Sequence, residues 1–325
     1  MTIKVGIIGT GFVGKLRAEA ISQDERSHLV ALAGHSPAKT LELATQHQAQ
    51  VINSWQELVA LPELDLVIIC SINRDHGLMT EAALKAGKHV VVEYPLALEP
   101  SHAAALLDLA AKQNLLLHVE HIELLGGLHQ ALKEHISAIG NSFFARYVTI
   151  NPQRPAPSKW TYSQKDFGFP FSGALSRLHR LTDLFGAVES VSCQQRYWGE
   201  GDTYRACLCN AQLAFVNGPI AEVTYGKGEV FWQDARNFEI QGDRGILSFV
   251  GDTGTLIREG ETTQIAIGGR KGLFALDTKF VLDYLTEGKP LYANPQASYY
   301  TLKVAEAAHQ SALTGKTIFV SNSHI

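Results

Sequence analysis

The chain has 325 residues, which is enough for two domains of ordinary size with a substantial buried core. Its formal net charge of −4 at pH 7 argues against nucleic acid as a partner, and we expect none. No apolar run approaches the roughly 20 residues that span a membrane, and residues 1–4 lead directly into a strand without a signal peptide, so we expect a cytoplasmic protein without membrane association.

The first part of the chain alternates between strand and helix patterns. It starts with a β-branched apolar strand at residues 3–8 and a helix at 12–22. Further strands are predicted at 28–33, 64–70, 88–93 and 115–120, and further helices at 37–46, 76–86 and 101–113, the last of them capped by Ser101. Such alternation is typical of parallel strands joined by crossover helices. Residues 1–122 are therefore predicted to form a Rossmann dinucleotide-binding domain of the α/β class.

A G-x-G-x-x-G motif stands at residues 9–14, between the first strand and the first helix. In this place Gly9 permits a tight turn, Gly11 lets backbone N–H groups approach a pyrophosphate, and Gly14 lets the helix pack closely on the strand. The helix N-terminus then faces the phosphates with its partial positive charge. A glycine triplet alone is weak support, but the surrounding alternation predicts a dinucleotide site.

The turn after the second strand, residues 34–39, decides between NAD and NADP. An Asp or Glu there would bond the ribose 2′-hydroxyl of NAD and repel the 2′-phosphate of NADP. This turn has no carboxylate, Ser36 can donate a hydrogen bond, and Lys39 lies within one helical turn. NADPH is therefore the favoured cofactor, and NADH the less favoured one. Ser36 also suits a capping role before the helix that begins at Pro37, and the two roles are compatible.

The pattern changes after Ile122, where we expect the second domain, residues 123–325, to begin. A helix is predicted at 124–138, ending at Gly140, and a late helix at 297–313 that can pack back on the first domain. Strand patterns occur between them at 143–151, 189–197, 204–215, 220–227, 235–241, 245–250 and 254–258. Glycine-rich turns between these strands predict an α+β domain with a large, mainly antiparallel sheet, one face of which can stay open.

Three motifs carry a family resemblance. Glu93-Tyr94-Pro95 follows the fourth strand, residues 117–125 read Leu-His-Val-Glu-His-Ile-Glu-Leu-Leu, and residues 167–186 begin Phe-Gly-Phe-Pro and end Leu-Phe-Gly. Together with the glycine motif and the α+β domain, this order of features resembles the glucose–fructose oxidoreductase and inositol dehydrogenase family. Within that family the motifs are most similar to those of the biliverdin reductases. From about Cys193 onward the resemblance rests on architecture and order alone.

The resemblance implies NADPH-dependent reduction of biliverdin IXα to bilirubin. A hydride would go to the central methine carbon (C10) and a proton to a pyrrole nitrogen. Biliverdin is an extended conjugated tetrapyrrole with two propionates, so it needs a broad, flat, partly apolar floor, which the open face of the sheet is expected to supply. The expected partner is thus a small-molecule substrate, and the sequence leaves the oligomeric state open.

Two positions depart from the sugar-oxidising members of the family. Tyr94 stands where those members carry a lysine, and a phenol with an ordinary pKa of about 10 is a poor base near neutral pH. We expect Tyr94 to donate a hydrogen bond or to form an aromatic wall. Those members also carry an Asp four residues before a His in this segment. Here Arg177 and Leu181 lie four residues apart instead, so the Asp–His pair is missing. His179 and Asp183 keep the spacing in reversed order, and we interpret them as a helix-surface contact.

Arg177 and Tyr94 are the predicted catalytic residues. The Arg177 guanidinium would stabilise negative charge on the pigment or hold a proton-donating water, whereas proton release by arginine itself would need a large fall in its pKa. The residues expected to contact substrate are Tyr94, Glu120, Glu123, Arg177 and Arg180. The residues expected to contact the cofactor or to shape its site are Gly9, Gly11, Phe12, Val13, Gly14, Ser36, Lys39, Ser71, Asn73, His76, Glu93 and Pro95.

Structural alternatives stand beside these roles. Arg177 could form a surface salt bridge, which contributes about 0–1 kcal/mol, and Tyr94 could be a packed aromatic side chain. Glu123 could cap the helix that starts near Ile122. Pro95 would fix the turn after the fourth strand, with a cis bond before it as one possibility.

Other basic residues have less specific expectations. Arg154, Lys159, Arg180 and Lys227 are candidate partners for the propionates, although most of them are expected to be ordinary solvated charges. Lys15 and Arg17 lie one turn into the first helix, and we expect them at the surface rather than at a phosphate.

The cysteines and histidines give no strong sign of a metal. The four cysteines show no C-x-x-C spacing and are expected as reduced, buried thiols, with Cys207 and Cys209 on one face of a strand. His118 and His121 lie near two carboxylates but across a strand-to-helix boundary. We therefore expect no metal site.

Two alternative functions remain open. One is an NADP-dependent sugar or cyclitol dehydrogenase of the same family that relies on a different acid. The other is a non-catalytic NADP(H)-sensing regulatory protein, because an enzyme that had lost its catalytic groups would also lack the lysine and the Asp–His pair.

Overall fold

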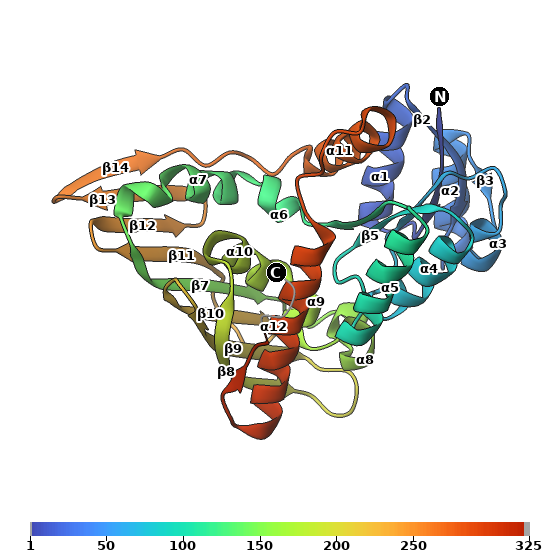
Figure 1. Ribbon diagram of the computed structural model, residues 1–325. Helices are drawn as coiled ribbons and strands as arrows, with labels where there is room; N and C mark the ends of the chain where they lie inside the picture. Colours follow the sequence, from blue (N-terminus) through green and yellow to red (C-terminus); the bar gives the residue numbers. More distant parts are fainter. Residues whose placement is uncertain (1, 322–325) are drawn as a thin grey trace. The chain divides into compact units, whose positions relative to one another are not determined.

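The computed structural model describes residues 2–321 (Figure 1). The chain folds into two compact units, of which the first comprises the residues up to Ile122 together with Lys271–Tyr299. The second unit comprises Glu123–Arg270 and the residues from Tyr300 onward. Among the described residues, no helix is both long enough and apolar enough to cross a membrane.

The first unit contains a six-stranded parallel sheet. Its strands are β1 (Ile3–Ile8), β2 (Ser27–Ala33), β3 (Gln50–Val51), β4 (Leu66–Ile69), β5 (His89–Glu93) and β6 (Leu117–Glu120). Their order in the sheet is β3-β2-β1-β4-β5-β6, the order of a dinucleotide-binding Rossmann fold. This topology confirms the predicted Rossmann fold of the α/β class.

Crossover helices connect these strands. They are α1 (Phe12–Gln23), α2 (Pro37–His47), α3 (Trp55–Val59), α4 (Asn73–Lys85) and α5 (Pro100–Lys112), and the short α6 (Ile122–Leu125) follows β6. The predicted cap at Ser101 is wrong, because α5 begins at Pro100 and Glu99 occupies the N-cap position. Proline favours the first helical position because its missing N–H has no partner there in any case.

A helix from much later in the chain completes the first unit. This helix, α11 (Leu273–Glu287), lies beside α1 (Figure 1), and the sequence analysis predicted no element for it. Val281 and Leu282 of α11 are almost fully buried and join the core formed by Val5, Ile7 and Ile21. Burying side chains of this size stabilises a fold by about 1.5–3 kcal/mol each.

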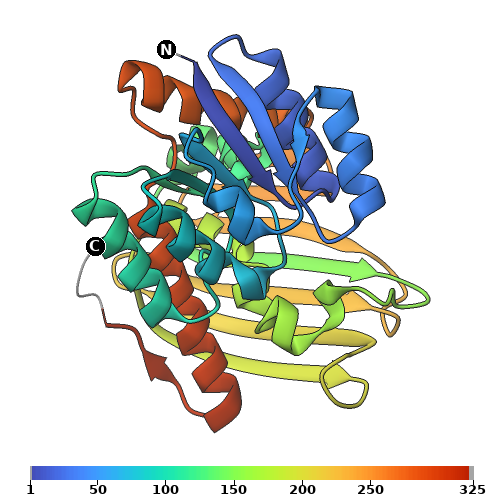
Figure 2. The ribbon, with the colours of Figure 1, turned by 90° about the vertical axis from the view of Figure 1, so that its right-hand side faces the viewer.

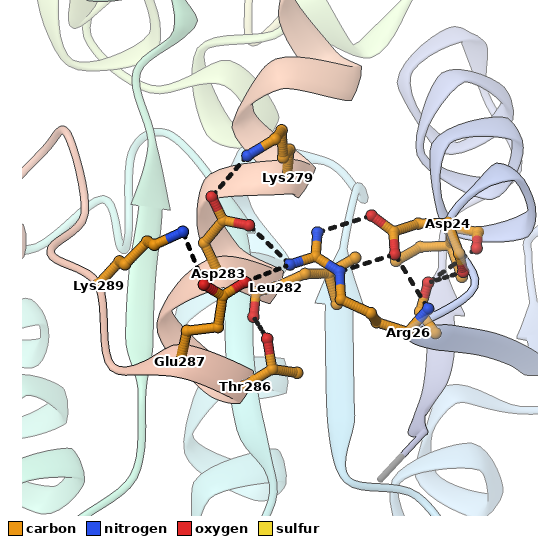
Figure 3. Close-up of polar contacts among 10 residues, drawn as sticks. Asp24, Arg26, Lys279, Leu282, Asp283, Thr286, Glu287 and Lys289 are labelled. Atoms are coloured by element: carbon orange, nitrogen blue, oxygen red, sulfur yellow. Dashed lines mark hydrogen bonds and ion pairs between the residues drawn. The ribbon is translucent and has the colours of Figure 1, made fainter.

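Polar contacts also fasten α11 to the α1–β2 turn (Figure 3). Arg26 pairs with Asp24 at 2.8 Å and with Asp283 of α11 at 2.6 Å. Glu287 approaches the same guanidinium at 3.4 Å, and Lys279 approaches Asp283 at 2.6 Å. The Arg26 side chain is part-exposed, so these pairs orient the helix more than they stabilise it.

The second unit is built on a nine-stranded sheet (Figure 2). Its strands are β7 (Ser142–Pro152), β8 (Val188–Trp198), β9 (Ala206–Phe215), β10 (Ile220–Gly228), β11 (Ala235–Gly242), β12 (Gly245–Val250), β13 (Thr253–Arg258), β14 (Glu261–Ile265) and β15 (Ile318–Phe319). Their order is β14-β13-β12-β11-β7-β10-β9-β8-β15. β7 and β10 are parallel and the other neighbours are antiparallel, so the prediction of a mainly antiparallel sheet is confirmed.

The helical segments of the second unit are short apart from α10 and α12. They are α7 (Gly127–His135), η1 (Ile136–Ile139), η2 (Trp160–Tyr162), α8 (Gln164–Phe167), α9 (Pro170–Gly173), α10 (Ser176–Phe185) and α12 (Pro295–Thr314), of which the residues up to Tyr299 belong to the first unit. α12 packs on β8 through hydrogen bonds from the backbone N–H of Cys193 to Ser311 and of Val188 to the Tyr300 hydroxyl.

The single helix predicted at 124–138 is wrong. The structure divides this segment into α6, α7 and η1, with a break at Gly126. A Cβ atom at Gly127 would lie 2.1 Å from the carbonyl oxygen of Gly268, so another backbone segment packs closely where α7 begins. Local sequence could not indicate this contact, because Gly268 is distant in the chain.

Strand register gives the sheet two distinct faces. Thr149 of β7 pairs with Tyr225 of β10, and the side chain of Thr149 contacts Arg177 of α10, so these residues point to the face that carries helices. On the opposite face Arg146 and Glu222 form an ion pair of 2.9 Å. Most side chains on that face, unlike those beneath α10, are part-exposed or exposed.

All four cysteines are free thiols, as expected. Cys193, Cys207 and Cys209 are buried, and Cys70 is part-buried. The alternation of β9 places Cys207 and Cys209 on one face of the strand, as predicted.

Candidate active site

The glycine motif adopts the geometry that its sequence predicts. Gly9 has a φ of +107°, and a Cβ there would lie 2.3 Å from the carbonyl oxygen of Cys70. At Gly14 a Cβ would lie 1.9 Å from the carbonyl oxygen of Gly9. These two steric roles are confirmed. A Cβ at Gly11 would meet no atom within 4 Å, so the backbone is open to a close ligand at the start of α1, where a pyrophosphate fits.

The neighbouring positions of the motif are also accessible. Phe12, the first residue of α1, is 76 % exposed and Val13 is part-exposed. An exposed aromatic residue at a helix start contributes nothing to the core of the unit. Their predicted contact with the cofactor is compatible with this exposure and stays a prediction.

The turn after β2 presents a hydroxyl and an ammonium group. Ser36 occupies the N-cap position of α2, with Pro37 directly after it, and is part-exposed. In the described structure Ser36 has the predicted N-cap position, but its side chain makes no capping hydrogen bond. Lys39 is exposed. Both groups can therefore meet a 2′-phosphate, and no carboxylate in the turn would repel it.

Substituting Ser36→Asp is expected to weaken NADPH binding by about tenfold or more and to leave NADH binding unchanged or improved. The added carboxylate repels a 2′-phosphate but can bond a ribose 2′-hydroxyl. Fluorescence titration with each nucleotide measures the ratio of dissociation constants. The matched control, Ser54→Asp at the N-cap of α3, should leave that ratio at the wild-type value; an unchanged ratio in Ser36→Asp would contradict the role of this turn.

The segment after β4 is tied to the turn after β5. His76 of α4 lies with Nδ1 2.9 Å from the carbonyl oxygen of Pro95 and Nε2 3.2 Å from that of Ser71. Burial lowers the pKa of His76, which favours the neutral imidazole, and a neutral ring can donate to only one of these carbonyls. Asn73 is also buried at the start of α4. His76 thus positions both turns at the carboxyl edge of the sheet, where cofactors bind in this fold.

Tyr94 lies directly after β5, and the Tyr94–Pro95 peptide bond is cis. The phenol ring stacks on His121, with ring centroids 5.4 Å apart and an interplanar angle of 5°. The His121 ring is itself held by Ser298, whose hydroxyl lies 2.7 Å from Nε2. Tyr94 is part-exposed, so it can form the aromatic wall that the sequence predicts.

The expectation that Arg17 lies at the surface is wrong. Its side chain is 0 % exposed and forms ion pairs with Asp277 of α11 and, at 3.0 Å, with Glu93 of β5. Thr278 accepts a further hydrogen bond of 3.1 Å. Lys15, in contrast, is half-exposed, as expected for a surface residue. Arg17 therefore connects α1 and α11 to the residue that precedes Tyr94.

Asp277 is the centre of this buried network. Besides Arg17, it contacts the His118 ring at 2.8 Å and accepts a hydrogen bond of 2.6 Å from the Tyr292 hydroxyl. Burial alone would raise the pKa of Asp277, but Arg17 and His118 outweigh it and hold the pKa well below its ordinary value. The Tyr292 hydroxyl in turn accepts the backbone N–H of His121. The network thus fixes the segment that stacks on Tyr94.

The two glutamates after β6 have different surroundings. Glu120 is buried and accepts the backbone N–H of Ile122 at the start of α6. Glu123 lies within the first turn of α6 and contacts His179 of α10 at 3.1 Å. Direct substrate contacts by either carboxylate stay predictions.

Arg177 lies at the start of α10, over the helix-bearing face of the large sheet. Its Nη1 donates to the Ser176 hydroxyl at 2.9 Å and its Nε to the Thr149 hydroxyl at 3.5 Å. The guanidinium carbon is 5.0 Å from the centre of the Tyr225 ring. Arg177 and the more exposed face lie on opposite sides of the sheet. The prediction that an open face of the sheet forms the floor for the pigment stays a prediction.

His179 and Asp183 of α10 have partners on other elements rather than the expected surface contact. His179 is buried against Glu123. Asp183 contacts His129 at 2.7 Å and Lys133 at 3.2 Å, both on α7. Burial raises the pKa of Asp183, but its two basic neighbours outweigh this effect and lower it to about 2. The two side chains hold α6 and α7 against α10.

The basic residues proposed as propionate partners divide into two groups. Arg154 and Lys159 are exposed, and the guanidinium carbon of Arg154 stacks 3.2 Å over the Trp232 ring. Arg180 and Lys227 are each only 5 % exposed, so these two are not ordinary solvated charges.

Aromatic rings surround the Lys227 ammonium. Nζ lies 3.7 Å from the centre of the Phe167 ring and 4.9 Å from that of Tyr162, and it donates a hydrogen bond to the carbonyl of Thr161. Ring faces attract cations, but they replace water only partly. Burial therefore lowers the pKa of Lys227 to about 8, and the positive charge of Arg177 adds to this effect.

This lowered pKa predicts a pH dependence of stability. Between pH 8 and the ordinary lysine pKa the unfolded chain binds more protons at Lys227 than the folded chain, so the Lys227 contribution to stability rises with pH. The difference in unfolding free energy between wild type and Lys227→Met is expected to shift in favour of wild type by about 2 kcal/mol from pH 7.5 to 9.5. Urea unfolding at both pH values measures it. The exposed Lys165→Met is the control, and a pH-independent difference for Lys227→Met would contradict the prediction.

Two parts of the site were missed by the sequence analysis. The sequence gives only a weak indication of the Arg17–Asp277 network. That indication is a charged residue on the inner face of a helix that packs on a buried strand. The aromatic cage of Lys227 has no local signal, because Tyr162, Phe167 and Tyr204 come from segments other than β10.

The fold and the glycine motif define a class of protein, and comparison with known families agrees. Residues 3–121 match the GFO/IDH/MocA model described as an oxidoreductase family with an NAD-binding Rossmann fold. Residues 133–320 match the model of the C-terminal alpha/beta domain of that family. The chain therefore belongs to the GFO/IDH/MocA oxidoreductase family.

Particular members of the family are similar over much of the chain. The crystal structure of biliverdin reductase from Synechocystis sp. PCC 6803, in complex with biliverdin and NADP+, has 52 % sequence identity and a TM-score of 0.93, covering 95 % of this chain and 98 % of that one. Biliverdin reductase A of Mus musculus is 31 % identical over 188 residues, and that of Homo sapiens is 29 % identical over 208 residues. The matches cover 58 % and 63 % of this chain. They span 60 % and 66 % of the mammalian proteins, less than two thirds of either. These matches confirm the resemblance to the biliverdin reductases.

Proposed function

We propose that this protein reduces biliverdin IXα to bilirubin with NADPH. The observation that carries the proposal is the identity of 52 % over nearly the whole chain with a biliverdin reductase whose crystal structure contains biliverdin and NADP+. The turn after β2 supports the choice of NADPH, because it combines Ser36 and Lys39 without a carboxylate. If this chain oxidised sugars in the way of the sugar-oxidising members, it would need a lysine at the position of Tyr94.

The reaction consumes one biliverdin, one NADPH and one proton, and gives bilirubin and NADP+. NADPH supplies a hydride, which forms the new C–H bond at C10, and the electron pair displaced from the conjugated system takes up a proton at a pyrrole nitrogen. Negative charge therefore develops on the tetrapyrrole before the proton arrives. A fixed cation or hydrogen-bond donor near that charge lowers the barrier.

Arg177 is the proposed source of this stabilisation. Ser176, Thr149 and the Tyr225 ring hold its guanidinium over the helix-bearing face of the sheet, so little reorganisation is needed when charge develops. Tyr94 is proposed to contact the pigment with its ring or its hydroxyl, and its stacking on His121 fixes its plane. The proton itself is proposed to come from a solvent molecule that Arg177 holds, because arginine does not release its own proton near neutral pH.

Incubation of the purified protein with NADPH and biliverdin tests the proposal. The long-wavelength absorption of biliverdin should disappear as bilirubin absorption and NADP+ form in equal amounts. Absence of turnover, with NADP-dependent oxidation of a sugar or cyclitol in a polyol panel, would select the dehydrogenase alternative. Cofactor binding without turnover on either panel, and a partner protein recovered with the cofactor-bound form, would select the regulatory alternative.

A cytoplasmic location is part of the same proposal. NADPH and a water-soluble dianionic substrate are both consistent with it. Fractionation of cells that express the chain with its own termini tests the location, and recovery with membranes would contradict it.

A further inference from the structure

Arg180 has buried hydrogen-bond donors that the described residues leave without an acceptor. It lies one turn after Arg177 in α10, is 5 % exposed, and has its guanidinium carbon 5.9 Å from the centre of the Tyr147 ring. Within residues 2–321, no acceptor reaches its Nε or Nη1. A buried charged donor without an acceptor is costly, so such a group is usually met by water or by an anion.

Other arginines surround the same tyrosine. Burial alone would raise the pKa of the Tyr147 phenol, but Arg180, Arg177 and Arg236 outweigh it and lower the pKa below its ordinary value. Burial lowers the pKa of the Arg236 guanidinium, and the positive charge of Arg270 adds to this effect. Arg236 of β11 pairs in register with Thr149 of β7, so its side chain points to the same face of the sheet as Tyr147. The charge around Tyr147 is therefore positive. The cluster comes from α10, β11 and the segment after β14, all within the second unit.

Carboxylates of the chain offset little of this charge at Arg236 and Arg180. Arg236 approaches Asp252 at 3.9 Å, but the Asp252 side chain is 96 % exposed and its charge is screened by water. The nearest acidic residue on α10, Asp183, contacts His129 and Lys133 instead. Guanidinium groups bind carboxylates well, since both are planar and can form two parallel hydrogen bonds.

We propose that Arg180 and Arg236, with the Tyr147 hydroxyl, form a subsite for one carboxylate of the substrate. The proposal rests on the proposed function, because biliverdin carries two propionates that such a subsite can bind. A propionate held here orients the tetrapyrrole on the sheet face that also carries Arg177. The buried donors of Arg180 then have an acceptor, and the part-exposed Arg236 lies at the open side of the subsite.

Paired substrates test the subsite separately from the reaction. Arg180→Gln is assayed with biliverdin and with its dimethyl ester, which has the same chromophore but no carboxylate. The KM for biliverdin is expected to rise about 10- to 100-fold, while the KM for the ester changes less than about threefold. Because the chemical step is unaltered, kcat for both substrates should stay within about threefold of wild type. Arg146→Gln, on the opposite face of the sheet, is the matched control and should change neither KM.

The outcomes are distinguishable. If wild type reduces neither pigment, the proposed function is wrong, and turnover cannot test the subsite. The equilibrium binding of the two pigments to wild type and to Arg180→Gln then tests whether the subsite binds a carboxylate. An equal rise in KM, or in the dissociation constant, for acid and ester would overturn the subsite. Far-UV circular dichroism and NADPH binding verify that Arg180→Gln is folded. If it is not, the part-exposed Arg236→Gln is subjected to the same comparison, and an absence of discrimination there overturns the proposal.

Discussion

Replacing Arg177 by alanine is expected to lower the turnover of biliverdin about 100- to 1,000-fold, because a preorganised donor near developing negative charge contributes this much to catalysis. NADPH affinity should stay within about twofold of wild type, since Arg177 belongs to the second unit and the glycine motif to the first. Stopped-flow reduction of biliverdin measures the chemical step, and fluorescence titration measures NADPH binding.

The control for Arg177→Ala is Arg146→Ala. Both arginines project from the large-sheet unit, but Arg146 pairs with Glu222 on the opposite face, so its loss should leave turnover within about twofold of wild type. A result in which both variants retain full activity would remove Arg177 from the mechanism. Equal losses in both would show instead that the unit is perturbed as a whole.

The sequence predicts those parts of the fold that depend on local patterns. The run at residues 3–8 is apolar and β-branched and becomes the central strand β1, and the glycines that follow have the steric roles expected of them. Strand boundaries in the second unit agree with the alternation of the sequence, and β12 agrees residue for residue. The spacing of apolar residues predicts which side of a strand or helix is buried. In these segments the side that the pattern predicts is the side that is buried.

What the sequence could not predict depends on contacts between distant segments. Arg17 is 260 residues from Asp277, and without that partner a cation on α1 is expected at the surface. The break before Gly127 depends on Gly268, and the lowered pKa of Lys227 depends on rings from other segments. The face that carries Arg177 follows from strand register and helix packing together, neither of which a single sequence specifies.

The second large effect is expected for the buried network of the first unit. Arg17→Met should destabilise the protein by about 3–5 kcal/mol, because it leaves Asp277 as a buried carboxylate without its guanidinium partner. For a unit of this size the loss corresponds to a fall in Tm of about 10 °C. Thermal melts followed by far-UV circular dichroism, with urea unfolding at pH 7, measure both quantities.

Arg26→Met provides the matched control, because Arg26 also joins the α1 region to α11 but does so through part-exposed ion pairs (Figure 3). Its loss should change Tm far less than that of Arg17, since water already solvates much of the pair.

The effect of acid separates the two sites further. The pKa of Asp277 is held below its ordinary value, so its contribution to stability is present at neutral pH and is lost as the pH falls below about 4. The stability difference between wild type and Arg17→Met should therefore shrink in acid, and a difference that stays constant from pH 7 to 3, or that equals that of Arg26→Met, would contradict the assignment of Arg17 and Asp277 as the charge pair that fastens α11.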